Sequence, residues 1–272
     1  MLYLVGLGLW DKEDISLKGK KAIERSDNVY IDTYTSILMG SPLHELEELY
    51  GKAVNPLDRE GMEQGSAKLI EEAKKKDIAI LVGGDALGAT THISLIQEAK
   101  EKGVDFQIIH NASILNAVSI VGLELYKYGQ VTSIPFDNPN LETPYEVIKK
   151  NKSIGLHTLL LLDLNPKENR FMTVNEAIEI LLKIAAEKEK GDKRQNKDVF
   201  TKETMCVGCA RLGGDYKIAY GKAIDLMDVD FGKPLHCLIV PGKLHFVEEE
   251  MLEGWRVEKN KVKGKKTKEL IK

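Results

Sequence analysis

The chain has 272 residues, of which 43% are hydrophobic and 30% are charged, and its formal net charge is −3. This length allows two domains of ordinary size, and the balanced charge gives no reason to expect a direct nucleic-acid partner. Charges and glycines interrupt every apolar run well before the roughly 20 residues that span a bilayer, and no basic leader precedes the first run. We therefore expect a cytoplasmic protein with no membrane partner.

In chain order, apolar runs alternate with amphipathic segments through the first half of the chain. The runs with the length and composition of strands are 2–5, 28–32, 78–82 and 105–110. The segments with helical periodicity are 15–27, 42–50, 65–76, 91–102 and 112–126. This alternation predicts an α/β fold with a mostly parallel sheet.

Glycine, proline and asparagine break the pattern at 128–145, where we expect one strand and a long loop. We place a domain boundary just before it, which gives an N-terminal α/β domain, 1–125, and a C-terminal α/β domain, 126–272. The later elements are an apolar strand-like run, a helix and a strand, at 157–164, 174–186 and 204–212. The charged segment 187–198 and the tail 258–272, which holds seven lysines, read as solvated chain.

Three strands end in glycine-containing turns. The first turn holds Gly6 and Gly8, the second follows residue 82 and includes Asp85, and the third is the Pro-Gly-Lys turn that follows the run 237–240. Ligands of open α/β sheets bind outside the carboxyl ends of the strands. These three turns are therefore the first places where we look for a binding site.

Two common phosphate motifs do not fit these turns. The opening GLGLWD places Asp11 where a dinucleotide fingerprint needs its third glycine, although Asp32 stands near the ribose-binding position. The second turn lacks the lysine of a P-loop. Its carboxylate, Asp85, suits a ligand with an amino group or a positive charge, or it caps the helix that follows, and the sequence leaves both interpretations open.

No residue pattern identifies a metal centre or a nucleophile. Cys206 and Cys209 form half of a zinc knuckle, but no second pair completes the four ligands, and the histidines are scattered through separate elements. The three cysteines lie in apolar runs and are expected to be reduced. No Gly-x-Ser-x-Gly elbow occurs, so the sequence favours a reaction that positions two substrates and names no catalytic residue.

Several segments in this order resemble the diphthine synthase family, a branch of the tetrapyrrole methylase superfamily of S-adenosyl-L-methionine-dependent methyltransferases. The resemblance covers nearly the whole chain and rests on segments that include LYLVGLGLWDKEDIS, GDALGATTH, HNASILNAVSIVGLELYKYG, CARLGG and PLHCLIVPGKLHFVEEEML. It implies two α/β domains of the tetrapyrrole methylase type with the cofactor in the cleft between them, assembled as a homodimer. The positions that match the family's cofactor contacts are Leu9, Asp85, Gly88, Ser113, Ile114, Leu162, Leu212 and His236.

The resemblance also implies the substrate and the reaction. The substrate is translation elongation factor 2 with an aminocarboxypropyl group on its target histidine, and the reaction methylates the amine of that group repeatedly to give diphthine, a step of diphthamide biosynthesis. Two alternatives stay open at this point. One is a methylase of a corrinoid or sirohaem precursor, and the other is a cofactor-binding subunit without catalytic activity.

Overall fold

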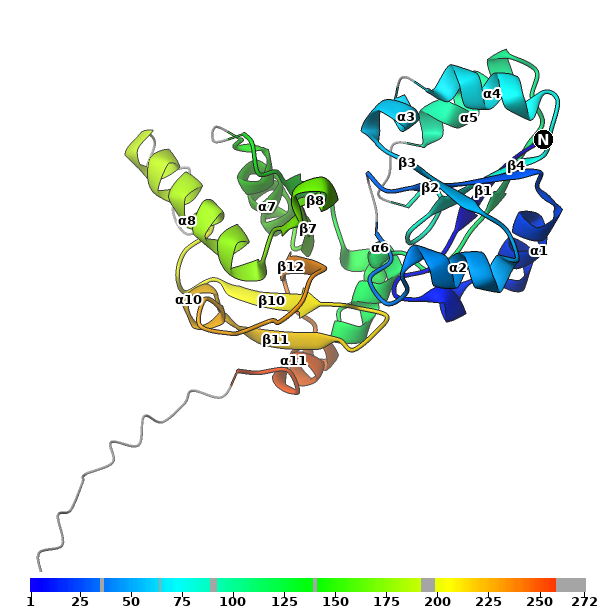
Figure 1. The fold of residues 1–272 in the computed structure, drawn as a ribbon. Helices are drawn as coiled ribbons and strands as arrows, with labels where there is room; N and C mark the ends of the chain where they lie inside the picture. Colours follow the sequence, from blue (N-terminus) through cyan, green and yellow to red (C-terminus); the bar gives the residue numbers. More distant parts are fainter. Residues whose placement is uncertain (35–36, 64, 89–91, 139–140, 192–198, 258–272) are drawn as a thin grey trace, which may run out of the picture.

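The computed structural model describes residues 1–34, 37–63, 65–88, 92–138, 141–191 and 199–257, and it contains two five-stranded sheets, each covered by helices (Figure 1). The lysine-rich tail and residues 192–198 of the charged segment lie outside these ranges. No helix within the described ranges is both long enough and apolar enough to cross a membrane.

The first sheet is entirely parallel, as the alternation of strands and helices predicts. Its strands stand in the order β3-β2-β4-β1-β5. Their bounds are β1 Leu2–Gly6, β2 Asn28–Asp32, β3 Val54–Leu57, β4 Ile78–Val82 and β5 Phe106–Ile109. The buried strands β1 and β4 are apolar on both faces, which is typical of a parallel sheet with helices on both sides.

Helices cover both faces of this sheet. Two of them, α1 (Leu17–Arg25) and α2 (Leu43–Tyr50), pack against one face, where Val5 and Leu81 are buried. The helices α4 (Ser66–Ala73) and α5 (Ile93–Glu101) pack against the other. Because side chains alternate along a strand, neighbouring residues of β1 and β4 enter the two separate cores. The shorter elements η1 (Lys12–Asp14) and α3 (Arg59–Glu63) complete this half.

The second sheet is mixed, in the order β11-β10-β12-β7-β6. Its bounds are β6 Thr132–Ile134, β7 Thr158–Leu162, β10 Met205–Ala210, β11 Lys217–Lys222 and β12 His236–Val240. All neighbours are antiparallel except β6 and β7. Since β7 and β10 are both antiparallel to β12, these two strands run in the same direction and end at the same edge.

The helices α7 (Thr143–Ser153), α8 (Val174–Gly191) and α10 (Ala223–Leu226) cover one face of the second sheet. The other face is covered by α11 (Phe246–Glu253) and by the connection between the sheets, which contains α6 (Ile114–Ala117), η2 (Val118–Val121) and η3 (Leu125–Lys127). A small ribbon of β8 (Leu164–Asn165), η4 (Pro166–Glu168) and β9 (Arg170–Phe171) follows β7.

The single helix predicted at 112–126 is wrong. Gly122 stands at φ 93°, in the left-handed region, so the chain leaves the helical path there; α6 and η2 precede this break and η3 follows it. Val118 and Val121 at this break are buried against the second sheet. The division at residue 125 stays a prediction, although these packing contacts tie the segment before it to the second sheet.

Candidate active site

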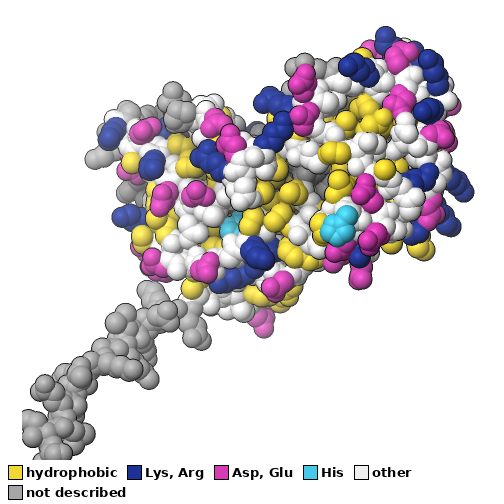
Figure 2. Space-filling model, in the orientation of Figure 1, with side chains coloured by type: hydrophobic (Ala, Val, Ile, Leu, Met, Phe, Trp, Pro, Cys, Tyr) yellow, Lys and Arg dark blue, Asp and Glu magenta, His cyan; other side chains and the backbone are white. Residues whose placement is uncertain are grey.

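A cavity of about 330 Å³ lies between the two sheets, within the size range of small-molecule sites. Figure 2 shows the surface hollowed between the two halves, with hydrophobic side chains in the hollow. In the first sheet, the lining residues follow β1, β2, β4 and β5. In the second sheet, they lie in β6, at the ends of β7 and β10, and at the start of β12. The strand directions bring these ends together.

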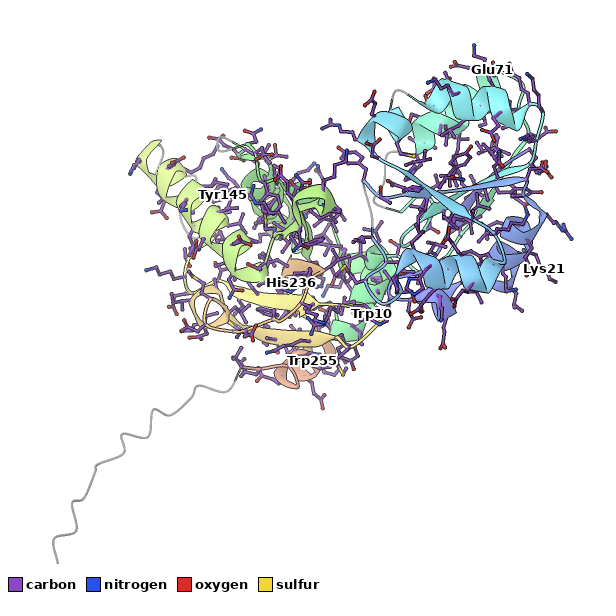
Figure 3. The ribbon with its side chains drawn as sticks, viewed as in Figure 1. Trp10, Lys21, Glu71, Tyr145, His236 and Trp255 are labelled. Atoms are coloured by element: carbon purple, nitrogen blue, oxygen red, sulfur yellow. The ribbon has the colours of Figure 1, made fainter. Side chains whose placement is uncertain are left out.

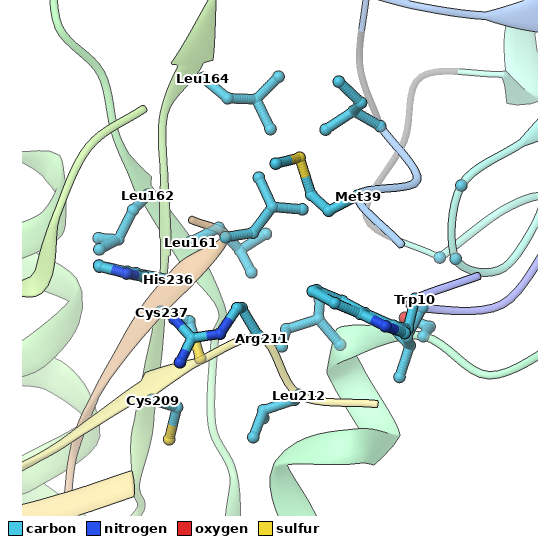
Figure 4. A pocket seen from close by; sticks show the side chains of 18 of the residues that line it. Trp10, Met39, Leu161, Leu162, Leu164, Cys209, Arg211, Leu212, His236 and Cys237 are labelled. Atoms are coloured by element: carbon cyan, nitrogen blue, oxygen red, sulfur yellow. The ribbon is translucent and has the colours of Figure 1, made fainter. Parts of the chain in front are cut away.

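Seven of the eight residues assigned by the family resemblance line this one cavity. They are Leu9, Gly88, Ser113, Ile114, Leu162, Leu212 and His236. Figure 4 shows Leu162, Leu212 and His236 on the wall formed by the second sheet, and Trp10 facing them from the side of the first sheet. The eighth residue, Asp85, lies behind the wall and is 9% exposed.

The first two glycine turns hold each other by paired hydrogen bonds. The N–H of Gly8 donates to the carbonyl of Gly84 at 3.1 Å, and the N–H of Gly84 donates back to the carbonyl of Gly8 at 2.6 Å. Gly8 has φ 89°, and a Cβ there would lie 2.3 Å from the Cβ of Asp14. Both the backbone conformation and the close approach therefore require glycine.

Two polar side chains that the sequence reasoning missed fix the first turn. Asp14 accepts the backbone N–H groups of Leu9 at 3.0 Å and Trp10 at 2.7 Å through Oδ2. The side-chain amide of Asn111, which follows β5, donates to the carbonyls of Gly6 at 3.0 Å and Asp14 at 2.9 Å. These bonds join the ends of two neighbouring strands and preset the shape of the cavity wall.

Asp85 braces the second turn. Its Oδ1 accepts the N–H of Leu87 at 2.9 Å, while its Oδ2 accepts the N–H of Asn111 and lies 2.9 Å from Nδ1 of His110. Burial acts to raise the pKa of Asp85, but these hydrogen bonds outweigh it and hold the pKa below its ordinary value. The carboxylate does not cap the following helix, which begins at Ile93.

The third glycine turn does not border the cavity, so that prediction is wrong. The strand β12 runs antiparallel to β7, and only its first residues, His236 and Cys237, reach the cavity. The turn after Val240 lies at the opposite edge, where the N–H of Gly242 donates to Nδ1 of His157 at 2.9 Å. The sequence shows that a strand ends in a turn but not which way that strand runs.

The two halves meet at the first turn. A Cβ on Gly213 would lie 2.6 Å from the Cβ of Leu9, and one on Gly214 would lie 2.2 Å from the indole of Trp10. Figure 3 shows Trp10 at this junction. The Leu-Gly-Gly end of the CARLGG segment therefore lets the backbone after β10 approach the first turn closely.

Two polar groups on the second-sheet wall have different partners. The guanidinium of Arg211 donates to the carbonyls of Asp215, Phe231 and Lys233, so these bonds hold it against its own half. The Nε2 of His236 lies 3.0 Å from the carbonyl of Lys233 and must carry the proton. This leaves Nδ1 as an acceptor, and it is buried with no hydrogen-bond partner in the described part of the chain.

The structure explains why the Cys-x-x-Cys pair is not half of a metal site. Cys206 and Cys209 lie an odd number of residues apart on β10 and enter different cores, on opposite faces of the second sheet. Within the described ranges, no group of three or more histidine, cysteine, aspartate or glutamate side chains could hold a metal ion.

The cavity's features fit the chemistry of S-adenosylmethionine. Glycine backbone and apolar side chains such as Leu9, Leu162 and Leu212 can enclose an adenosine, and the free Nδ1 of His236 can accept a hydrogen bond from an amino or hydroxyl group. No lysine lines the cavity, and its one arginine is held by carbonyl groups, so a phosphate has little to bind within the described residues.

The family comparisons agree with this geometry. Residues 1–191 match the family model of tetrapyrrole (corrin/porphyrin) methylases. A diphthine synthase from Methanocaldococcus jannaschii is 47% identical over 258 residues, covering 93% of this chain and 98% of the relative. A probable diphthine methyl ester synthase from Arabidopsis thaliana is 46% identical, with 94% and 98% covered.

A solved structure gives the same result. The crystal structure of a diphthine synthase superposes with a TM-score of 0.84 at 42% identity and covers 94% of this chain and 95% of its own. Sequence and fold therefore agree over nearly the full length of both chains. The chain belongs to the tetrapyrrole methylase family, within the branch formed by the diphthine synthases.

Proposed function

We propose that the protein is an S-adenosylmethionine-dependent diphthine synthase that methylates translation elongation factor 2. The acceptor is the amine of the aminocarboxypropyl group on the factor's modified histidine. The observation that carries the proposal is the convergence on one cavity of seven residues that match the family's cofactor contacts. The relatives' identity over nearly their whole length supports the assignment of this acceptor.

The cofactor, when bound, supplies a methyl group activated by a positively charged sulfur. The chain's own residues exclude water and form a surface whose shape is fixed by hydrogen bonds before the ligand binds. The paired turns at Gly8 and Gly84 form one wall, and buried Leu212 and Cys237 belong to the other. Orientation and exclusion of water are the main sources of acceleration for a displacement of this kind.

The acceptor amine attacks only in its neutral form, because an ammonium has no lone pair. His236 is the one histidine that lines the cavity in the described ranges, and its pKa lies below its ordinary value, chiefly because it is buried. It is therefore neutral near pH 7, with Nδ1 free to accept. We assign His236 to holding the cofactor and leave deprotonation of the amine to water.

Replacing Asp85 with alanine is expected to weaken S-adenosylmethionine binding about tenfold, with the fold retained. The variant loses the acceptors for two backbone N–H groups, each worth about 0.5–1.5 kcal/mol, so the second turn loosens. Titration calorimetry measures the change. Asp27→Ala is the matched control, because Asp27 also accepts a backbone N–H, that of Asp77, but away from the cavity. Unchanged affinity in folded Asp85→Ala would refute the assignment.

A milder effect is expected for His236→Ala. One hydrogen bond from the ligand is lost, so the dissociation constant for S-adenosylmethionine should rise about threefold to tenfold. The exposed His44 provides a control substitution on the first half of the molecule. If His236→Ala binds as tightly as the unaltered protein, Nδ1 does not face the cofactor.

The number and position of methyl groups define a second candidate activity. One relative, from Arabidopsis thaliana, is named for a methyl ester product and is as similar as the archaeal diphthine synthases. The amine accepts methyl groups only until it becomes a trimethylammonium, and any further methyl must esterify the carboxylate. Mild base removes an ester but leaves methylated nitrogen intact, so mass measurement before and after base treatment separates the two products.

We also propose that the protein is a cytoplasmic homodimer. Exposed large hydrophobic residues gather on the connection between the sheets and on α11: Leu115, Ile120, Leu125, Tyr126, Phe246, Val247 and Met251. The two segments touch, since Gly122 packs against Met251 and the N–H of Glu124 donates to Glu248. Apolar patches of this kind mark interaction surfaces.

Tyr126→Glu is expected to shift the protein from dimer to monomer in sedimentation velocity. Tyr126 is 81% exposed, so a charged side chain there destabilises the free monomer little. In the proposed interface the same charge would be buried, which disfavours the dimer. Leu17→Glu is the control, because Leu17 is 78% exposed but lies on α1 in the other half. Equal sedimentation of both variants as dimers would place the interface elsewhere.

The acceptor is tested by measuring release of S-adenosylhomocysteine with three acceptors. These are elongation factor 2 with the aminocarboxypropyl group, the same factor without it, and a sirohaem precursor. We expect turnover only with the first. Turnover with the tetrapyrrole would favour the other branch of the family, and cofactor binding without any turnover would favour a binding subunit.

A further inference from the structure

One acidic residue, Asp163, is among those that line the cavity within the described ranges, and the proposed roles do not use it. Asp163 follows the last residue of β7 and is partly buried. Its Oδ1 accepts the N–H of Leu164 at 2.9 Å, and its Oδ2 accepts the N–H of Phe136 at 2.9 Å. These two hydrogen bonds fix the carboxylate in place. Each oxygen keeps a second lone pair, so the group can still accept a hydrogen bond from a ligand.

Asp163 lies at the outward end of the cavity. Its neighbours Leu164, Ile37 and Met39 are only partly buried, and Ser133 is exposed, whereas Cys209 and Leu212 at the other end are buried. Figure 4 shows Leu164 and Met39 at one end of the cavity and Cys209 and Leu212 at the other. A side chain that belongs to a large protein can enter only through the outward end.

The other charged side chain of the cavity in the described ranges does not complement the acceptor's amine. Arg211 repels a cation and is held by three backbone carbonyls of its own half. The acceptor amine is a cation before it reacts and becomes a cation again after each methyl transfer. A fixed carboxylate at the entrance is the group that complements this charge.

We infer that Asp163 binds the acceptor's amino group and holds it at the outward end of the cavity. This inference rests on the proposed function. In each round the nitrogen forms a bond to the methyl carbon, the carbon–sulfur bond breaks, and its electron pair stays on sulfur. The resulting ammonium gives its proton to water before the next round. Asp163 accepts hydrogen bonds from the N–H groups that remain after the first and second rounds, and its negative charge attracts the trimethylammonium that the third round leaves without an N–H.

The test is Asp163→Asn, with the pH dependence of kcat as its main readout. A nearby carboxylate stabilises the ammonium, so removing its charge lowers the pKa of the bound amine by about one unit or more. The acidic limb of the profile, which reports loss of the ammonium proton, therefore moves to lower pH. We also expect KM for the modified elongation factor 2 to rise about tenfold while the calorimetric affinity for S-adenosylmethionine is unchanged.

Two further variants separate charge from structure. Asp163→Glu keeps the charge, so its acidic limb should stay at the original pH even where kcat falls. Asp137→Asn removes a charge of the same kind from a nearby position that is 93% exposed and outside the cavity, and it should change neither KM nor the profile.

Three results would overturn the inference. One is an acidic limb that does not move in Asp163→Asn, and another is a loss of S-adenosylmethionine affinity that accounts for the whole defect. The third is an equal shift of the limb in Asp163→Glu. Failure of the unaltered protein to methylate elongation factor 2 would instead reject the proposed function, and the two failures are therefore distinguishable.

Discussion

Glu248→Gln is expected to lower the free energy of unfolding by about 3 kcal/mol and the melting temperature by roughly 10 °C. Glu248 is 1% exposed and accepts four donors: the ammonium of Lys127, the N–H groups of Glu124 and His245, and Nε2 of His157. A glutamine can accept at only one end, so its amide NH₂ would face two of these donors. The network joins α11 to the second sheet, away from the cavity.

The same network makes stability depend on pH. Burial acts to raise the pKa of Glu248, but the four donors outweigh it and lower the pKa from 4.5 to about 2. The stabilisation is complete above pH 4.5 and is lost as the pH falls toward 2, which amounts to about 3 kcal/mol. His157 also lowers stability as the pH falls. Burial lowers its pKa, so the folded state opposes its protonation, and stability is lost below the ordinary pKa of 6.5.

Urea unfolding at pH 7 and pH 3 measures both effects. The control is Glu249→Gln on the same helix, where the side chain is exposed and its loss should change stability by less than about 0.5 kcal/mol. In the unaltered protein, the free energy of unfolding should be lower at pH 3 than at pH 7. We expect most of this difference to disappear in Glu248→Gln. A variant as stable as the unaltered protein at pH 7 would show that the network does not stabilise the fold.

Gly8→Ala is expected to weaken S-adenosylmethionine binding more than tenfold and to destabilise the fold by about 2–4 kcal/mol. The new Cβ would lie 2.3 Å from Asp14, whose carboxylate holds the N–H groups of Leu9 and Trp10. Relief of that clash moves the first turn, which forms part of the cavity wall. Calorimetry and urea unfolding give the two quantities.

Gly103→Ala is the control that separates backbone strain at a positive φ from a steric clash of the new Cβ. Gly103 also has a positive φ, +67°, but a Cβ there would meet nothing within 4 Å. We expect about 1–2 kcal/mol of destabilisation and unchanged cofactor affinity for this variant. If the two alanine variants bind the cofactor equally well, the first turn is not part of the cofactor site.

Local patterns in the sequence predict much of the first half. The strands at 28–32 and 78–82 agree with β2 and β4 at both ends, because apolar runs bounded by polar residues define a buried parallel strand. Other elements gave no such signal. The edge strand β3 contains Asn55 and Pro56, and the start of α7 is hidden in a loop-like stretch by Pro144.

The site was predictable only in part, because short sequence segments do not show contacts between distant parts of the chain. The first two glycine turns and the family resemblance identify several of the residues that line the cavity, since both depend on short segments. The partners that hold the cavity in shape come from distant segments: Asn111 lies 105 residues from Gly6, to which it donates. The direction of β12, which removes the third turn from the site, likewise depends on the pairing of strands far apart in the chain.

The proposed activity is tested at its product by tandem mass spectrometry of elongation factor 2 that carries the aminocarboxypropyl group, after incubation with this protein and S-adenosylmethionine. We expect stepwise methyl additions that all map to the amine of the modified histidine and survive mild base. No mass gain at that histidine, with cofactor binding intact by calorimetry, would reject the proposed activity.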